Sequence, residues 1–341
     1  MCQVGGNLGS GGGAAGGRRR ILITGGLGQL GSEFVAALRD LHGVDHVLLT
    51  DLRDDVNRSL IQSGPFARLD ARDERALDEL VTGHRIDTIY HLAALLSAVA
   101  ETAPQKAWDI NMNGLLAVLE VARRRGCAVF TPSSIGAFGP NTPKDWTPQD
   151  TIQRPTSIYG VTKVAGELLC DYYYRKYGVD TRGVRYPGII SNKTPPGGGT
   201  TDYAVEIYHA AVATGRYVCF LAGDTYLDMM YMPDAIKAAL DLMEADPERL
   251  RHRNAFNVSA MTFCPEDQAA IIRRYIPEFE ISYAIDPVRQ AIANSWPNNL
   301  EDYAARVEWG WEPAYDLDAM TRDMLRVLTA RRGEVSREGA V

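Results

Sequence analysis

Short apolar runs and amphipathic stretches alternate along the chain from Arg20 to Arg185. Apolar runs bounded by polar residues predict strands, and apolar residues spaced three or four apart predict helices. The predicted strands are Ile21–Thr24, His46–Thr50, Phe66–Leu69, Thr88–Leu92, Ala128–Pro132 and Thr181–Arg185, and the predicted helices are Gln29–Leu41, Arg75–His84, Pro104–Arg125 and Ile158–Tyr177. This alternation predicts an α/β fold with a doubly wound parallel sheet.

The rhythm breaks after Arg185. A Pro/Gly loop covers Ser191–Thr201, and shorter mixed elements follow, among them a core strand around Met229–Met232. We therefore predict a tail over residues 1–19, a strand–helix core over 20–190, and a smaller lobe over 191–341 from which some strands return to the core. This lobe is expected to cap the carboxyl ends of the strands, where ligands bind in this architecture.

Composition and charge narrow the function classes. The chain has 341 residues, 45% of them apolar, and 36 basic against 43 acidic residues. Such an acidic chain is a poor partner for nucleic acid or anionic membranes, and no run of about 20 apolar residues suggests a membrane span. The five cysteines lie far apart without a C-x-x-C pair, so neither a disulfide scaffold nor a thiolate zinc site is expected; the histidines show no metal-binding spacing either.

Glycine is enriched, with 32 residues, and it is clustered. Eight glycines lie in Met1–Gly17, which lacks the apolar segment of a secretory signal and is expected to be disordered or a processed leader. Three more form Gly197–Gly199 in the Pro/Gly loop, and we expect them to let this loop close over a ligand.

A further glycine cluster joins the first predicted strand to the first predicted helix. Gly25, Gly28 and Gly31 permit a tight turn, close approach of a pyrophosphate, and close helix–strand packing. The helix N-terminus attracts phosphate, and Asp51 ends the second strand, where a carboxylate binds an adenosine ribose and repels a 2′-phosphate. This pattern predicts a dinucleotide site and favours NAD over NADP. The nearby Arg53 leaves NADP open, and a purely structural glycine turn is the alternative.

Tyr159 and Lys163 are four residues apart and share one face of the long helix. A tyrosine, with a usual pKa of about 10, needs help to act as a base at neutral pH. A nearby ammonium stabilises the phenolate, and Ser133-Ser134 supplies hydroxyls for a substrate alcohol. The alternative is a chance Y-x-x-x-K on a solvated helix.

These motifs make the chain resemble the extended short-chain dehydrogenases/reductases over about residues 20 to 330. The motifs occur in the family's order: Thr24–Gly31, His91-Leu92-Ala93-Ala94, Asn111, Tyr159-x-x-x-Lys163 and Trp309–Pro313. Further stretches are similar to the L-threonine 3-dehydrogenases of that family: Ala94–Ala98, Pro132–Pro140, Arg185–Ile190, Pro196–Ala204, Asn257–Met261, Arg289–Ala293 and Ser295–Pro297. Ser134 departs from the threonine of many relatives but keeps a hydroxyl.

The resemblance implies NAD-dependent oxidation of the C3 hydroxyl of L-threonine to 2-amino-3-ketobutyrate. Tyr159 is the implied general base, Lys163 stabilises its phenolate and holds the nicotinamide ribose, and Ser134 orients the substrate oxygen. The residues implied to bind NAD are Gly25, Gly28, Gln29, Leu30, Gly31, Asp51, Asp70, Leu92, Ala93, Ala94, Leu95, Asn111, Tyr159, Lys163, Tyr186 and Pro187. The residues implied to contact substrate are Ser97, Ser133, Ser134, Tyr159, Gly199, Thr200 and Trp296. Asn111 is implied to support Lys163 through water, and Trp296 has ordinary core packing as its alternative.

Two rival functions share part of this pattern. A nucleotide-sugar epimerase or dehydratase shares the glycine turn and the Tyr–Lys pair but fits the Gly-Gly-Gly-Thr-Thr-Asp-Tyr and Ser-Trp-Pro segments poorly. A non-catalytic NAD-sensing regulator should lack the serine–tyrosine–lysine set. The resemblance also implies a homodimer built from the two long helices, coupling to a glycine C-acetyltransferase, and a mitochondrial location for a eukaryotic protein or a cytoplasmic one otherwise.

Overall fold

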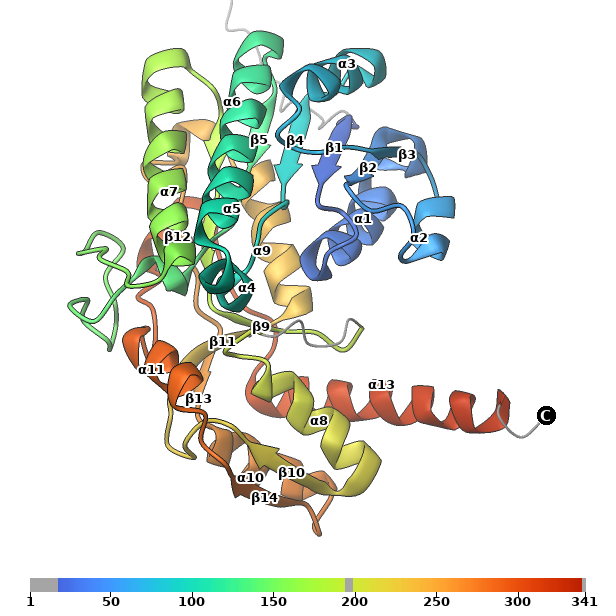
Figure 1. The fold of residues 1–341 in the computed structure, drawn as a ribbon, viewed down its shortest axis with the longest axis vertical. Coiled ribbons are helices and arrows are strands. Elements are labelled where there is room, and N and C mark those ends of the chain that lie inside the picture. Colours follow the sequence, from blue (N-terminus) through green and yellow to red (C-terminus); the bar gives the residue numbers. More distant parts are fainter. Residues whose placement is uncertain (1–17, 194–198, 339–341) are drawn as a thin grey trace, which may run out of the picture.

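The structure is a computed structural model that describes residues 18–193 and 199–338 (Figure 1). The predicted disordered tail or leader, Met1–Gly17, lies outside the described residues, as do residues 194–198 of the Pro/Gly loop with Gly197 and Gly198. The predicted closure of that loop therefore stays a prediction.

A six-stranded parallel sheet forms the upper part of the molecule (Figure 1). Its strands are β1 (Ile21–Thr24), β2 (Val47–Asp51), β3 (Phe66–Arg68), β4 (Thr88–His91), β5 (Ala128–Phe130) and β7 (Thr181–Arg182), in the order β3-β2-β1-β4-β5-β7. Every neighbouring pair is parallel. The predicted doubly wound α/β sheet is confirmed.

Both faces of this sheet are buried because side chains alternate along a strand. Ile21 and Ile23 of β1 pack into one core cluster with α1 (Gln29–His42) and α9 (Met232–Glu244). Leu22 packs on the opposite face, in a cluster with α3 (Glu74–His84), α6 (Gly114–Arg125) and α7 (Ile158–Tyr177). The continuous apolar strands of the sequence thus reflect burial on both faces.

The predicted strands Ala128–Pro132 and Thr181–Arg185 are wrong at their carboxyl ends. The main sheet stops at Phe130 and Arg182, and β6 (Ser133–Ser134), β8 (Val184–Tyr186) and β12 (Phe256–Asn257) form a separate sheet in the order β12-β8-β6. Gly183 marks the break, since a Cβ there would lie 2.3 Å from the carbonyl oxygen of Thr131. The two backbones touch at this point and stay paired beyond it, with Ser133 opposite Arg185 and Ser134 opposite Tyr186, so both segments leave the main sheet together.

The predicted helix Pro104–Arg125 is interrupted in its first half. It comprises α5 (Pro104–Trp108), a π-helical segment at Asp109–Asn113, and α6. π-Helical segments occur frequently at functional sites, and this one contains Asn111.

The remaining helices and strands build the lower lobe and its links to the sheet, except the first of them, which lies beside β3 in the upper part of the molecule (Figure 1). They are α2 (Arg58–Gln62), α4 (Ser97–Thr102), β9 (Gly188–Ile190), α8 (Tyr203–Thr214), β10 (Arg216–Cys219), β11 (Leu227–Tyr231), β13 (Met261–Phe263), α10 (Pro265–Tyr275), β14 (Glu280–Tyr283), α11 (Pro287–Ser295), α12 (Tyr303–Trp309) and α13 (Leu317–Glu338). Two small sheets, β13-β11-β9 and β10-β14, stabilise this lobe. No helix within the described residues is long and apolar enough to cross a membrane.

Asp228 is a carboxyl group buried completely in β11. Its oxygens accept hydrogen bonds from Ser259 Oγ at 3.0 Å and from the Leu300 amide at 2.9 Å. Desolvation outweighs these donors and raises the pKa of Asp228 to about 8. The folded state therefore holds a proton that the unfolded chain, with an ordinary aspartate pKa of about 4, releases at lower pH.

We expect stability to fall as the pH rises from about 4 to about 8, because the unfolded state binds fewer protons than the folded state in this window. Asp228→Asn keeps the shape and an acceptor oxygen but cannot ionise, so it should flatten this slope and raise the melting temperature at pH 8 more than at pH 5. Thermal unfolding of both proteins across this range measures the effect. An equal slope in both would contradict it.

Candidate functional site

A cavity of about 240 Å³ lies where the carboxyl ends of the main strands meet the lower lobe. The predicted residues that line it are Gly25, Gly28, Gln29, Leu30, Gly31, Leu92, Ala94, Ser97, Ser133, Ser134, Tyr159, Lys163, Tyr186, Pro187, Gly199, Thr200 and Trp296. Residues from distant parts of the sequence thus surround one space, at the edge of the sheet where ligands bind in this architecture.

The glycine turn forms one wall of the cavity and leaves no room for side chains. A Cβ on Gly31 would lie 2.4 Å from the Gly25 carbonyl oxygen, and one on Gly25 would lie 2.7 Å from the Ala93 backbone. Gly25 also has φ of +67°, which favours glycine. Gly28 is the N-cap residue of α1, so no side chain caps the start of this helix. The first amides of α1 are therefore suited to a pyrophosphate.

Asp51 ends β2 beside this turn and is buried. Its Oδ2 accepts a hydrogen bond from the Leu27 amide at 3.0 Å, and Arg53 Nε lies 3.1 Å from Oδ1. Arg53 is thereby paired with the carboxylate that is predicted to bind a ribose. The turn and the carboxylate together fit the adenosine diphosphate half of NAD.

Asp70 and Leu95 line neither this cavity nor the smaller one described below. Arg72 Nη2 lies 2.6 Å from Asp70, and this ion pair lowers the pKa of the Asp70 carboxyl. The same guanidinium also binds Asp109, which links the end of β3 to the π-helical segment. A role of Asp70 in binding NAD stays a prediction.

The Asn111 side chain forms hydrogen bonds with both backbone groups of Leu95. Its Oδ1 accepts from the Leu95 amide at 2.8 Å, and its Nδ2 donates to the Leu95 carbonyl at 3.2 Å and to Thr162 Oγ1 at 3.1 Å. These direct partners tie the segment after β4 to α7. Support of Lys163 through water stays a prediction.

Tyr159 and Lys163 stand on the first turns of α7, which Ser157 caps by accepting from the Gly160 amide at 3.0 Å. A Cβ on Gly160 would lie 2.2 Å from the Gly136 carbonyl oxygen, so α7 touches the turn that follows β6. Lys163 Nζ lies 5.4 Å from the centre of the Tyr159 ring and donates to the Pro132 carbonyl at 2.6 Å. The helix is therefore held closely against β6, the strand formed by Ser133 and Ser134, which we call the serine strand.

The same close approach places Ser134 beside the tyrosine. The Gly136 amide donates to Ser134 Oγ at 3.1 Å, and a Cβ on Gly136 would lie 3.1 Å from the Tyr159 ring. Because Ser134 Oγ accepts from the backbone, its own proton remains available for an oxygen of a bound molecule. Ser134, Tyr159 and Lys163 thus converge on the cavity, an arrangement that the predicted acid–base set requires.

The opposite wall comes from the lower lobe. Thr200 is buried, and the Gly199 amide donates to Asp202 Oδ2 at 2.6 Å, which closes the turn around Thr200. Trp296 is 7% exposed, lines the cavity and also packs into the core of the lower lobe. The two alternatives for Trp296, pocket wall and core packing, are therefore compatible.

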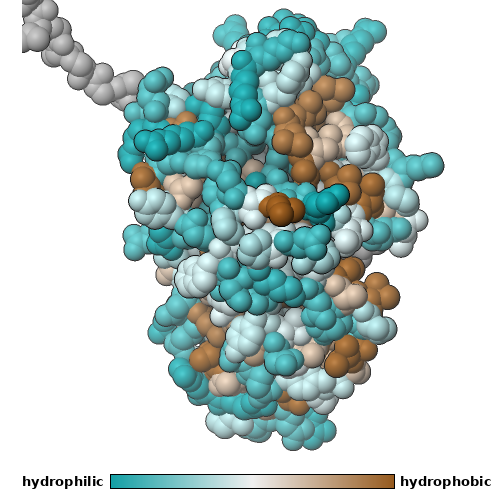
Figure 2. Space-filling view, turned by 90° about the vertical axis from the view of Figure 1, so that its left-hand side faces the viewer, coloured by the Kyte–Doolittle hydropathy of each residue, from teal (hydrophilic) through white to brown (hydrophobic). Residues whose placement is uncertain are grey.

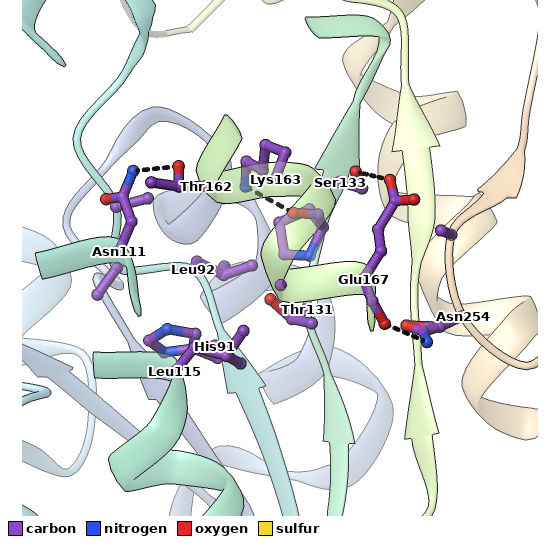
Figure 3. A pocket seen from close by; sticks show the side chains of 15 residues that line it. His91, Leu92, Asn111, Leu115, Thr131, Ser133, Thr162, Lys163, Glu167 and Asn254 are labelled. Carbon is purple, nitrogen blue, oxygen red and sulfur yellow. Dashed lines mark hydrogen bonds between the residues drawn. The ribbon is translucent and has the colours of Figure 1, made fainter. Parts of the chain in front are cut away.

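A second cavity of about 40 Å³ lies behind Lys163 (Figure 3). His91, Ala93, Asn111, Ser133, Lys163 and Glu167 are among its lining residues. Burial lowers the pKa of His91 to about 3, and its Nδ1 lies 2.8 Å from Thr24 Oγ1. At neutral pH His91 is therefore an uncharged neighbour of Lys163.

Sequence reasoning missed several residues of the site. Gly136 and Gly160 permit the contact between α7 and the serine strand. Among the described residues that line the cavity, Asp202 is the one with an acidic side chain. The Tyr-Gly dipeptide was a visible signal for Gly160, whereas Asp202 becomes relevant only once the loop is folded. Within the described residues, no cluster of three or more His, Cys, Asp or Glu residues is arranged to hold a metal ion.

Comparison with known proteins gives matches over most of the chain. The NAD dependent epimerase/dehydratase family matches residues 21–259. An uncharacterized epimerase/dehydratase of Staphylococcus saprophyticus is 56% identical over 313 residues, which cover 92% of this chain and 98% of the relative.

Solved structures are equally similar. An L-threonine dehydrogenase from Clostridium difficile superposes with a TM-score of 0.91 at 54% identity and covers 92% of this chain and 99% of its own. A GalE-like L-threonine dehydrogenase from Cupriavidus necator in its holo form has a TM-score of 0.88 at 49% identity and covers 91% and 99%. A UDP-glucose 4-epimerase from Thermotoga maritima, covering 92% and 99%, has a TM-score of 0.77 at 22% identity, and this likeness shows the fold alone.

Proposed function

The chain belongs to the NAD dependent epimerase/dehydratase family, and we propose that it is an NAD-dependent L-threonine 3-dehydrogenase. The observation that carries this proposal is the convergence of Ser134, Tyr159 and Lys163 on a cavity that also contains the glycine turn. The threonine dehydrogenases among the solved structures, at 49% and 54% identity, support the choice of substrate.

The residues of the cavity take defined roles in this reaction. Tyr159 accepts the proton of the C3 hydroxyl as a general base, with the Lys163 ammonium close enough to stabilise the phenolate. Ser134 donates its proton to the same substrate oxygen and orients it. NAD, when bound, supplies the hydride acceptor for the hydrogen on C3. The product is 2-amino-3-ketobutyrate.

The lower lobe would hold the zwitterionic end of the substrate. Ser97 and Thr200 offer neutral hydroxyls, and the turn at Gly199 offers backbone to a carboxylate. Trp296 would cover the bound molecule from the core side. The small volume of the cavity suits an amino acid next to a nicotinamide.

The cofactor site favours NAD over NADP. Asp51 is buried and held towards the turn by the Leu27 amide. A 2′-phosphate would meet this carboxylate at short range. Because Arg53 is already paired with Asp51, it is less free to bind a 2′-phosphate.

The two rival functions have less support. A nucleotide-sugar epimerase or dehydratase shares the fold and the Tyr–Lys pair, but the epimerase structure is only 22% identical to this chain. A non-catalytic NAD sensor has no use for a serine–tyrosine–lysine set converging on the cavity. The segments that carry Thr200 and Trp296 line the cavity and fit a nucleotide-sugar epimerase or dehydratase poorly.

We further propose a homodimer formed through α5, α6 and α7. Trp108, Leu116, Val161, Leu168 and Tyr172 expose between 39% and 62% of their surface on these helices. Hydrophobic side chains gather on the upper part of the face shown in Figure 2, and such patches mark interfaces. The product would pass to a glycine C-acetyltransferase in threonine catabolism. The Staphylococcus relative favours the cytoplasmic alternative and gives no support to a mitochondrial one.

The decisive experiment measures NADH formation by the purified protein. We expect an absorbance increase at 340 nm with NAD and L-threonine, smaller rates with L-serine and L-allo-threonine, and none with UDP-glucose. Turnover of UDP-glucose without any oxidation of L-threonine would replace the proposal by the epimerase alternative. Binding of NAD without turnover of any of these compounds would favour the sensor.

A further inference from the structure

A buried ion pair lies directly behind the serine strand. Glu167 of α7 and Arg185 of β8 have side chains that are 8% and 7% exposed. Arg185 Nη2 lies 2.8 Å from Glu167 Oε2, and Arg185 Nε lies 3.1 Å from Oε1. Such a bidentate pair fixes the direction of both side chains.

The carboxylate of this pair also reaches the strand that carries Ser134. Ser133 Oγ donates to Glu167 Oε1 (Figure 3), and Gln153 Nε2 donates to Oε2 at 2.7 Å. Two donors on each oxygen use the full acceptor capacity of the carboxylate. The Ser133 hydroxyl therefore has a fixed direction, towards α7.

Two consecutive residues, Pro132 just before β6 and Ser133 within it, are in this way tied to two consecutive turns of one helix. Lys163 holds the Pro132 carbonyl, and Glu167, one turn later in α7, holds the Ser133 hydroxyl. Helix α7 also carries Tyr159. These contacts join the helix that carries Tyr159 to the strand that carries Ser134.

Arg185 is connected to the same strand through the backbone pairing of β8 with β6. Strand β8 pairs with β6 so that Arg185 is opposite Ser133. The guanidinium donates to the Gln149 carbonyl at 2.8 Å and to Asn257 Oδ1 at 3.1 Å, and it lies 5.0 Å from the centre of the Phe138 ring. The ion pair is thus in contact with the serine strand through Glu167, and with Gln149, Asn257 and Phe138 through Arg185.

We propose that Glu167 and Arg185 are positioning residues of the reaction, which together hold Ser134 at its working distance from Tyr159. The inference rests on the proposed dehydrogenase function. A buried ion pair is a weak source of stability, and apolar residues of similar size often replace one without loss. Its contacts with the serine strand and the catalytic helix give it an orienting role, and misplacement of a reacting group by about 1 Å can cost about 100-fold in rate.

Ser133→Ala is the sharpest variant because it cuts the link to the strand and leaves the ion pair in place. We expect kcat for L-threonine oxidation to fall about tenfold or more, with little change in NADH affinity or in melting temperature. If Ser133 acted instead by contacting the substrate alone, KM would rise and kcat would stay. Active molecules are counted by NADH titration, so that unfolded protein does not enter kcat.

Arg185→Lys and Arg185→Met test the pair itself. The lysine variant keeps the charge and one donor, and we expect it to retain more kcat than the methionine variant, which leaves Glu167 without its guanidinium. Glu308→Gln is the matched control, because Glu308 is also buried but binds His252 and the backbone of Arg251 away from the cavity. It should change the melting temperature and leave kcat unchanged.

The outcomes separate this inference from the proposed function. A parent protein that oxidises L-threonine, with unchanged kcat in Ser133→Ala and both Arg185 variants, overturns the positioning role alone. An equal fall of kcat in Glu308→Gln also overturns it, since the effect would then be one of general stability. A parent that does not oxidise L-threonine overturns the proposed function itself.

Discussion

Replacement of Tyr159 by phenylalanine is expected to lower kcat for L-threonine oxidation by about 10²- to 10⁴-fold, because the ring stays but the group that accepts the C3 proton is lost. The ring packs against Gly136, and a Cβ there would lie 3.1 Å from it. This contact does not involve the hydroxyl. The fold of the site and the affinity for NADH should therefore be close to those of the parent.

The measurement combines initial rates at saturating NAD with an NADH titration by fluorescence. Tyr303→Phe is a suitable control, since Tyr303 is 68% exposed at the start of α12. It should keep the parent rate. Substantial turnover by Tyr159→Phe would remove the tyrosine from the mechanism, whereas loss of NADH binding would show that the hydroxyl has a structural role as well.

The main sheet could be predicted from the sequence because its central strands are buried on both faces. Ile21–Thr24 and Ile158–Tyr177 have the predicted bounds, since an uninterrupted apolar run and a capped amphipathic stretch are local patterns. Gly183 shows why other boundaries were missed. Gly183 lies between β7 and β8, where its backbone approaches Thr131, 52 residues earlier in the chain, and no local sequence pattern indicates such a contact.

The residues of the candidate site also fall into two groups, those that local spacing brings together and those that only the fold brings together. Gly25, Gly28 and Gly31 lie within seven residues, and Tyr159 and Lys163 lie within five, so spacing alone brings each set together. Glu167 and Arg185 come from different elements and are joined only by the pairing of β8 with β6 and its packing on α7. Their separation in the sequence therefore does not predict that they are in contact. The supporting residues of a site are therefore harder to predict than the residues that touch the ligand.

Gly31→Ala is expected to reduce NADH affinity at least tenfold and to lower the melting temperature. The added Cβ would lie 2.4 Å from the Gly25 carbonyl oxygen and 2.6 Å from the Gly26 Cα. Both neighbours are backbone of the turn that is proposed to hold the pyrophosphate, so relief of the contact must move the turn or the start of α1. Overpacking of this kind costs about 1–3 kcal/mol, and about 1.4 kcal/mol corresponds to a tenfold change in affinity.

Gly83→Ala is the matched control, because Gly83 also lies within a helix but has no neighbour within 4 Å of an added Cβ. Alanine favours a helix over glycine by about 0.5–1 kcal/mol at either position. The intrinsic preference therefore predicts a small gain for both variants, and only the contact with the turn predicts a loss for Gly31→Ala. Thermal unfolding with and without NADH distinguishes the two. Parent-like NADH affinity in Gly31→Ala would show that the close approach of α1 to the turn is not required for binding.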